Sequence, residues 1–212
     1  MQHITELNEI QARAVACLME KQLATPEQYP LTQNSLLLGC NQKTNRNPVM
    51  SLSSGELGHS LNELEADGWI GVDSGSRASR YAHRVRSKLN LNLGKEGEAE
   101  QAILCMLMLR GPQTLNELVA RTAKMVDDDA LIADRLNYLS QRNTALVELQ
   151  PKAPGQREAR YAQRVFDAGD IQALPVSASR GSNPADTARI DQLERDVAEL
   201  KAQMKDLLTQ LS

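Results

Sequence analysis

The chain contains the same stretch twice, and this repetition limits its possible folds more than any other property. The first copy covers residues 61–85 and the second covers residues 136–165. Each copy has a helix end, an apolar strand, a flexible loop and a returning strand, which reads Arg-Tyr-Ala-His-Arg-Val at 80–85 and Arg-Tyr-Ala-Gln-Arg-Val at 160–165. Two copies are too few for a solenoid, so the repeat predicts two tandem domains.

Composition agrees with two small helical domains. The 212 residues include one Trp, one Phe and four Tyr, so aliphatic side chains must fill the cores, and this favours helices over β-sandwiches. Basic and acidic residues are equal in number within 1–93 and within 94–166, and the net charge of −3 comes from 167–212. A negative net charge argues against a protein that coats nucleic acid without discrimination.

In residues 1–93 the pattern predicts three helices followed by a hairpin. The first helix ends at Thr25-Pro26, because proline disfavours helix in the residue before it. Thr32 is placed to cap a short second helix, which Gly39 is expected to end in the left-handed conformation. A capping box at 53–56 opens the third helix. This order predicts a winged-helix domain, in which the hairpin loop is the wing.

The first wing concentrates positive charge. Between Ser74 and Leu93 there are five cations and no acidic residue, and a loop tip of Ser and Gly precedes them. Such side chains can contact a phosphate backbone or enter a minor groove. We therefore expect nucleic-acid contacts from this wing and from the polar segment before the third helix, through Lys43, Arg46, Arg77, Arg80, Arg84 and Arg86.

A structural alternative remains open for these residues. The arginine stems of an ordinary solvated hairpin can cover the edge of a core, and Lys43 and Arg46 can cap neighbouring helix ends. The third helix, which enters the major groove in a helix-turn-helix, has four acidic residues between 54 and 67 and no Lys or Arg. Asn62 can pair with adenine there, but any contact is expected to come mainly from the wing.

Residues 94–166 predict a second domain of the same kind. An apolar helix ends at Gly111-Pro112, and Thr114 and Glu117 form a capping box for the next helix. Three aspartates at 127–129 begin the third helix, where they suit the positive end of its dipole; such a triplet can also bind a divalent cation, but no loop of oxygen ligands accompanies it. The second wing is less basic than the first, so we expect this domain to be mainly architectural.

The remaining residues predict a linker and a coiled-coil helix. Residues 167–188 are rich in Gly, Pro and Ser, whereas 189–212 have apolar residues at alternating spacings of three and four. β-branched residues at the first two a positions and Leu at d favour a parallel homodimer, whereas the alternative for so short a helix is to fold back onto a domain. The seam consists of Ile190, Leu193, Val197, Leu200, Met204, Leu207 and Leu211.

Catalytic and metal-binding patterns are absent from the sequence. There is no Gly-rich phosphate loop, Cys pair or Gly-x-Ser-x-Gly, and the three His have no ligand spacing. Three separated cysteines suggest a reducing compartment, and we expect Cys17 and Cys105 to be core residues. No signal peptide or membrane span is visible, so the sequence predicts a cytoplasmic protein that is not an enzyme and needs no cofactor.

Several segments together carry a family resemblance. They are Leu7-Asn8-Glu9, Tyr29-Pro30-Leu31-Thr32, Asn41-Gln42-Lys43-Thr44-Asn45-Arg46-Asn47-Pro48-Val49 and the two Arg-Tyr-x-x-Arg-Val strand ends. On these, roughly residues 4–166 resemble the YceH-like family of uncharacterised bacterial proteins. The resemblance implies a mainly α fold with small β-hairpin wings, in two tandem winged-helix domains, and a bacterial cytosolic location. It brings no established activity, so no catalytic residue is carried over.

Two functions remain open. The first is a DNA-binding, transcription-regulator-like homodimer that contacts mainly the phosphate backbone of double-stranded DNA through the first wing. The second is a tandem winged-helix scaffold that binds a protein partner and no nucleic acid, which the acidic third helix favours. The analogy to the winged-helix fold favours DNA binding, whereas the placement of charge weakens this preference, and DNA binding stays narrowly ahead.

Overall fold

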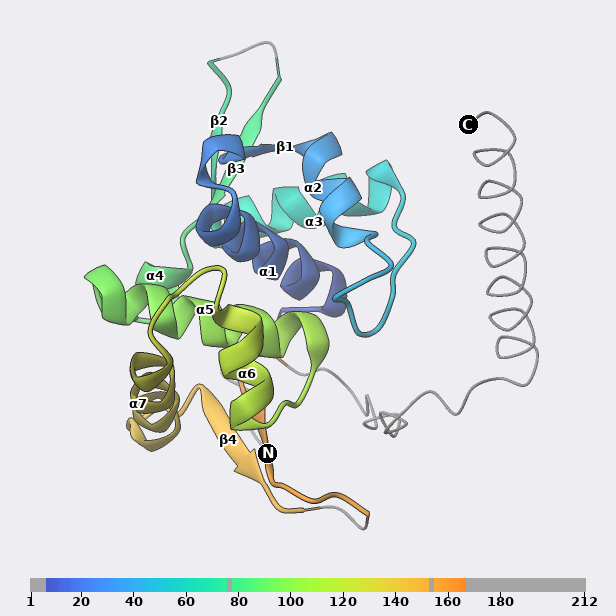
Figure 1. The fold of residues 1–212 in the computed structure, drawn as a ribbon. Coiled ribbons are helices and arrows are strands. Elements are labelled where there is room, and N and C mark those ends of the chain that lie inside the picture. The colour runs from blue at the N-terminus through green and yellow to red at the C-terminus, as the bar shows by residue number, and fades with distance from the viewer. Residues whose placement is uncertain (1–6, 76–77, 153–154, 167–212) are drawn as a thin grey trace, which may run out of the picture. The chain divides into compact units, whose positions relative to one another are not determined.

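The computed structural model describes residues 7–75, 78–152 and 155–166. In this part of the chain the protein is mainly helical, with seven α-helices and two small antiparallel sheets (Figure 1). None of these helices has both the length and the apolar character needed to cross a bilayer. The predicted linker at 167–188 and the coiled-coil seam from Ile190 to Leu211 lie outside the described residues.

Three helices pack together in the first half of the chain. They are α1 (Glu9–Ala24), α2 (Gln33–Cys40) and α3 (Ser54–Ala66), and a short 3-10 helix (Pro26–Gln28) follows α1. The predicted caps are confirmed. Thr32 accepts a hydrogen bond from the backbone N–H of Ser35 at the start of α2, and Ser53 and Glu56 form the reciprocal capping box of α3.

The prediction that Gly39 ends the second helix is wrong. α2 continues to Cys40, and its C-cap is Asn41 with a φ of −88°. Gly39 is buried against α1, where an added Cβ would lie 3.9 Å from the Cβ of Cys17. The helix therefore ends beyond the glycine and without a left-handed residue.

The first sheet has three strands in the order β1-β3-β2. They are β1 (Leu31–Thr32), β2 (Ile70–Asp73) and β3 (Arg80–His83), and the short helix α4 (Val85–Lys88) follows β3. In the β2–β3 pair Gly71 lies opposite Ala82, and in the β1–β3 pair Leu31 lies opposite Tyr81. The sequence did not predict β1 or α4, because segments of two and four residues are too short to show a period.

The second half repeats this order with its own helices and hairpin. It contains α5 (Gly94–Arg110), α6 (Leu115–Thr122), α7 (Asp129–Gln141), β4 (Val147–Gln150) and β5 (Arg160–Gln163). The predicted capping box of Thr114 and Glu117 opens α6, and Asp128 caps α7 by accepting from the backbone N–H of Leu131. In place of a third strand there is an isolated bridge between Gln113 and Tyr161.

The repeated arginine of the Arg-Tyr motif holds each hairpin to the turn before the middle helix of its half. Nη1 of Arg80 donates to the carbonyl oxygen of Pro30 at 2.9 Å. Nη1 of Arg160 donates to the carbonyl oxygen of Pro112 at 3.0 Å. The motif therefore has the same structural role in both copies.

α1 and α5 lie against each other and join the cores of the two halves (Figure 1). The thiol of Cys105 donates to the carbonyl oxygen of Ala16, and the amide of Gln101 donates to that of Met19, both at 3.4 Å. Cys17 and Cys105 are fully buried, as predicted. Because one continuous core spans the described residues, a boundary at residue 93 stays a prediction.

Candidate nucleic-acid interface

β3 presents Arg80 and, directly after its last residue, Arg84 on the solvent side of the first sheet. Successive side chains of a strand point to opposite faces. Tyr81 and His83 face the core side, whereas Arg80 and Arg84 are exposed. Four strand residues span about 13 Å, so the two guanidinium groups can reach different phosphates of one duplex.

Arg84 lies across the neighbouring strand. A Cβ added at Gly71 would be 3.1 Å from Nη2 of Arg84, so the guanidinium occupies the space above this glycine. Among the described residues no carboxylate forms an ion pair with Arg84. The Arg84 side chain is exposed on the face that it shares with Arg80.

Arg80 also has no ion pair with a described carboxylate, although Asp73 is its partner in the β2–β3 register. Oδ1 of Asp73 instead accepts a hydrogen bond from the backbone N–H of Gly75 at 3.0 Å. The hydrogen bond to Pro30 uses one of the five N–H donors of the Arg80 guanidinium, and the others can meet a further acceptor.

The cations that follow Arg84 are held more closely by the protein. Nη2 of Arg86 lies 4.0 Å from Oε1 of Glu98, and the Arg86 side chain is 34% exposed. Nζ of Lys88 lies 5.7 Å from the centre of the Trp69 ring, within the range of a cation–π interaction. Arg86 is thus less available to a ligand than Arg80 or Arg84. The predicted contact at Arg77 lies outside the described residues.

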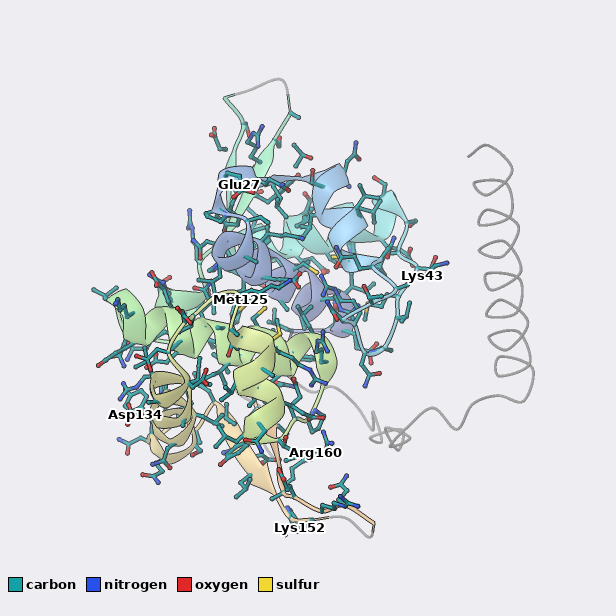
Figure 2. All side chains as sticks on the ribbon, in the orientation of Figure 1. Glu27, Lys43, Met125, Asp134, Lys152 and Arg160 are labelled. Carbon is teal, nitrogen blue, oxygen red and sulfur yellow. The ribbon has the colours of Figure 1, made fainter. Side chains whose placement is uncertain are left out.

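The polar segment before α3 separates its two predicted cations. Lys43 is exposed and extends from the loop (Figure 2). Arg46 has a fully buried side chain, whose Nη2 lies 2.6 Å from Oε2 of Glu20 and whose Nε donates to the carbonyl oxygen of Gly39 in the last turn of α2. Arg46 therefore caps a neighbouring helix end, as the structural alternative proposed. We remove Arg46 from the set of expected nucleic-acid contacts.

The exposed face of α3 is acidic. Glu56 and Glu65 are exposed, while Glu63 accepts from Gln11 at 2.8 Å and lies 3.2 Å from His59. Asn62, the candidate for adenine contact, is exposed between them. α3 contains no Lys or Arg. Contacts from the hairpin to phosphates are therefore better supported than contacts from α3 to base edges.

His83 lies on the buried side of β3 and contributes no positive charge to the candidate interface. Its Nδ1 accepts from the backbone N–H of Val85 at 3.3 Å, which leaves the proton on Nε2, 2.8 Å from Oε1 of Gln22. Burial, and to a smaller extent the charge of Arg86, lower the pKa of His83 to about 4. Sequence reasoning missed this network, which includes Gln101 from α5, because its members are far apart in the chain.

The second hairpin carries its cations differently. Lys152 and Arg157 are exposed near its tip, and Arg160 and Arg164 lie in its strand and directly after it; Figure 2 labels Lys152 and Arg160. The β2–β3 and β4–β5 hairpins project in opposite directions from the helices (Figure 1). Within the described residues no group of His, Cys, Asp and Glu could hold a metal ion.

Comparison with known proteins places the chain in a family. Residues 7–156 match the model of a family described as "Protein of unknown function, DUF480". The chain is 42% identical over 210 residues to a UPF0502 protein of Cellvibrio japonicus, covering 95% of this chain and 94% of that one. It is 43% identical over 214 residues to a UPF0502 protein of Shewanella pealeana, covering 96% and 99%. The chain therefore belongs to the DUF480/UPF0502 family of uncharacterised bacterial proteins.

Proposed function

We propose that this protein binds double-stranded DNA as a transcription-regulator-like protein, mainly through phosphate contacts made by the first hairpin. The order of three helices and a hairpin, with β1 added beside β3, supports a winged-helix domain whose wing is the loop between β2 and β3. The matching order in the second half supports a tandem pair of such domains. The proposal implies a cytoplasmic location, where bacterial DNA lies.

One observation carries this proposal. Arg80 and Arg84 are exposed on one side of the first sheet, and no carboxylate among the described residues pairs with either of them. A cation without a carboxylate partner can bind a phosphate without first losing a charge-assisted hydrogen bond. The acidic face of α3 directs this binding to the DNA backbone, because Glu56 and Glu65 would repel phosphates near a base-reading helix.

Fluorescence anisotropy with a labelled mixed-sequence duplex at low salt tests the proposal. The wild-type protein should bind, and R80A/R84A should bind about tenfold or more weakly, since phosphate contacts dominate such affinities. The matched control is K152A/R157A, which removes two exposed cations from the second hairpin and should bind like the wild type. Absence of binding by the folded wild-type protein, or an equal weakening in both variants, would contradict the proposal.

We also propose that the chain forms a homodimer through residues 189–212. The support is the heptad seam from Ile190 to Leu211, and a two-fold dimer would present two first hairpins to one duplex. Light scattering of the full chain and of a chain ending at residue 188 measures the mass. The full chain should have the mass of a dimer and the shorter chain that of a monomer, and an unchanged oligomer would exclude this seam as the dimer contact.

A second candidate function is a scaffold that binds a protein partner. Large apolar side chains are exposed on α2 and in the segment that follows it, where Leu38 is 74% exposed and Val49 is 57% exposed. Exposed apolar side chains favour a protein contact over a nucleic-acid contact, and the acidic face of α3 would repel phosphates. A pull-down that recovers a protein partner, abolished in L38S but unaffected by nuclease, would favour this function.

A further inference from the structure

The two copies of the Arg-Tyr-x-x-Arg-Val motif differ in the acidic residues around them. In the second copy, Nη1 of Arg160 lies 2.8 Å from Oε2 of Glu117, and Nε of Arg164 lies 3.8 Å from Oε2 of Glu148. The corresponding Arg80 and Arg84 of the first copy have no such carboxylate among the described residues. The two arginines of the motif thus form ion pairs with carboxylates in the second half, whereas in the described part of the chain those of the first half form none.

The residue that takes the place of Glu117 in the first half is Ser35. Both follow a threonine N-cap and occupy the third position of their helix: Thr114 accepts from the backbone N–H of Glu117, and Thr32 accepts from that of Ser35. Both helices also start beside the proline carbonyl that binds the first arginine of the motif. A carboxylate at Ser35 would therefore be positioned to pair with Arg80.

The residue that takes the place of Glu148 is Gly71. Glu148 lies opposite Ala162 in the β4–β5 register, and Gly71 lies opposite Ala82 in the β2–β3 register. The guanidinium of Arg84 occupies the space above Gly71. Two independent positions, one on a helix and one on a strand, therefore carry an acid in the second half and none in the first.

These acids change what each pair of arginines can bind. Burial opposes ionisation of Glu117, but hydrogen bonds from Thr114 and Arg160, with the charges of Arg160 and Arg121, outweigh it and hold the pKa of its carboxyl below the ordinary value. The side chains of Arg160 and Arg164 are 19% and 32% exposed. A phosphate approaching them would have to displace a charged carboxylate, whereas Arg80 and Arg84 are exposed and have no carboxylate partner among the described residues.

We infer that Arg80 and Arg84 form a two-point site for the phosphodiester backbone, which Ser35 and Gly71 keep open, and that Glu117 and Glu148 close the equivalent site of the second half. This inference rests on the proposed DNA binding. It adds that these four residues restrict the binding to the first half of the chain. Asp73 is acidic and lies opposite Arg80, but Oδ1 of its carboxylate accepts a hydrogen bond from the backbone N–H of Gly75.

Glutamate and glutamine at the same position separate charge from size. The full-length variants S35E and S35Q test Arg80, and G71E and G71Q test Arg84, with thermal unfolding as a check on folding. We expect each Glu variant to bind the labelled duplex about tenfold more weakly than its Gln partner, and its slope of log K against log salt to be shallower by about 0.9 for each phosphate that it no longer binds. Equal affinities in both Glu/Gln pairs would overturn the inference while leaving the proposed function intact.

The converse exchange tests the second half. In the R80A/R84A background, E117Q/E148Q should restore duplex binding, because Gln retains the capping box of α6 and removes the negative charges beside Arg160 and Arg164. The control D127N/D129N makes the same change in charge at the start of α7 and should restore nothing. Equal recovery in both, or recovery in neither, would contradict closure by the two acids. If the folded wild-type protein binds no duplex at low salt, the proposed function itself fails.

Discussion

At the scale of single residues, burial decides which charged groups are available for binding. Arg46 and Lys43 are three positions apart in a polar segment, yet one side chain is fully buried and the other is exposed. No local pattern distinguishes them, because the partner of Arg46 is Glu20 on α1, a helix that precedes this segment in the chain. Sequence reasoning therefore identified the cations but not their environments.

Arg46→Ala tests this structural role. Removing one partner of a buried ion pair leaves Glu20 without its cation, which typically costs about 3–5 kcal/mol of stability. Chemical denaturation should show this loss, whereas Lys43→Ala should change stability by less than about 0.5 kcal/mol, as is usual for surface substitutions. A stability of R46A equal to that of the wild type would contradict the buried pair.

His83 should make the protein less stable in acid. Its pKa of about 4 in the folded state lies below the value near 6.5 in the unfolded chain, so the unfolded state binds more protons between these limits. With respect to His83, the free energy of unfolding is therefore highest above pH 6.5. It decreases by roughly 3 kcal/mol in total as the pH falls towards 4.

The control for this pH dependence is taken from the second half, where Gln163 occupies the place of His83. Oε1 of Gln163 accepts from the backbone N–H of Val165 at 2.6 Å, just as Nδ1 of His83 accepts from that of Val85. His83→Gln should therefore fold, and urea denaturation at pH 7 and pH 5 should show a smaller loss of stability than in the wild type. An identical loss in both proteins would show that His83 is not its source.

At the scale of elements, the parts that the sequence predicted are those with local signals. Capping boxes at Ser53 and Thr114 and helix breakers at Thr25-Pro26 and Gly111-Pro112 depend on neighbours within a few residues, and all are confirmed. β1 depends on pairing with β3, about fifty residues further along the chain, and it was missed. The ion pair of Arg160 with Glu117, which distinguishes Arg160 from Arg80, was missed for the same reason. A comparison of the third residues of α2 and α6, which are Ser35 and Glu117, would have found this difference.

The first turn of α5 contains a glycine that packing requires. A Cβ at Gly97 would lie 1.8 Å from the backbone oxygen of Asn92, whose own amide groups bind the buried carboxylate of Glu100. Gly-to-Ala within a helix normally stabilises by up to about 1 kcal/mol, but here the backbone must move, and we expect a loss of about 1–3 kcal/mol.

Gly55→Ala in α3 is the matched control for Gly97→Ala. The nearest atom to its added Cβ is Oγ of Ser53 at 4.0 Å, so this substitution should be neutral or stabilising. Thermal unfolding of the two variants gives the comparison. A Gly97→Ala protein as stable as Gly55→Ala would show that the loop before α5 moves away at little cost.

At the scale of the whole molecule, the contact between α1 and α5 couples the two halves. Because their cores are continuous, we expect the described part of the chain to unfold in one transition. Trp69 is the single tryptophan and lies in the first half, so its fluorescence reports that half, whereas far-UV circular dichroism reports all helices. Coincident urea transitions are expected, and an earlier fluorescence transition would support separate domains divided near residue 93.

At this scale the two halves also differ in a way on which the proposed function depends. The two hairpins share a motif and project in opposite directions (Figure 1). They differ in how the described carboxylates pair with their arginines. A protein of this kind should bind duplex DNA with one half and use the other as a scaffold. Tandem domains with equal sites would instead bind through both hairpins.

The salt dependence of duplex binding is the most direct measurement of this difference. In a plot of log K against log salt, the wild-type slope should be linear and negative, and R80A/R84A should reduce its magnitude by about 1.8, the value for two phosphate contacts. K152A/R157A should leave the slope unchanged. Equal slopes for the wild type and R80A/R84A, or no duplex binding by the folded wild-type protein at any salt concentration, would contradict a phosphate-binding first half.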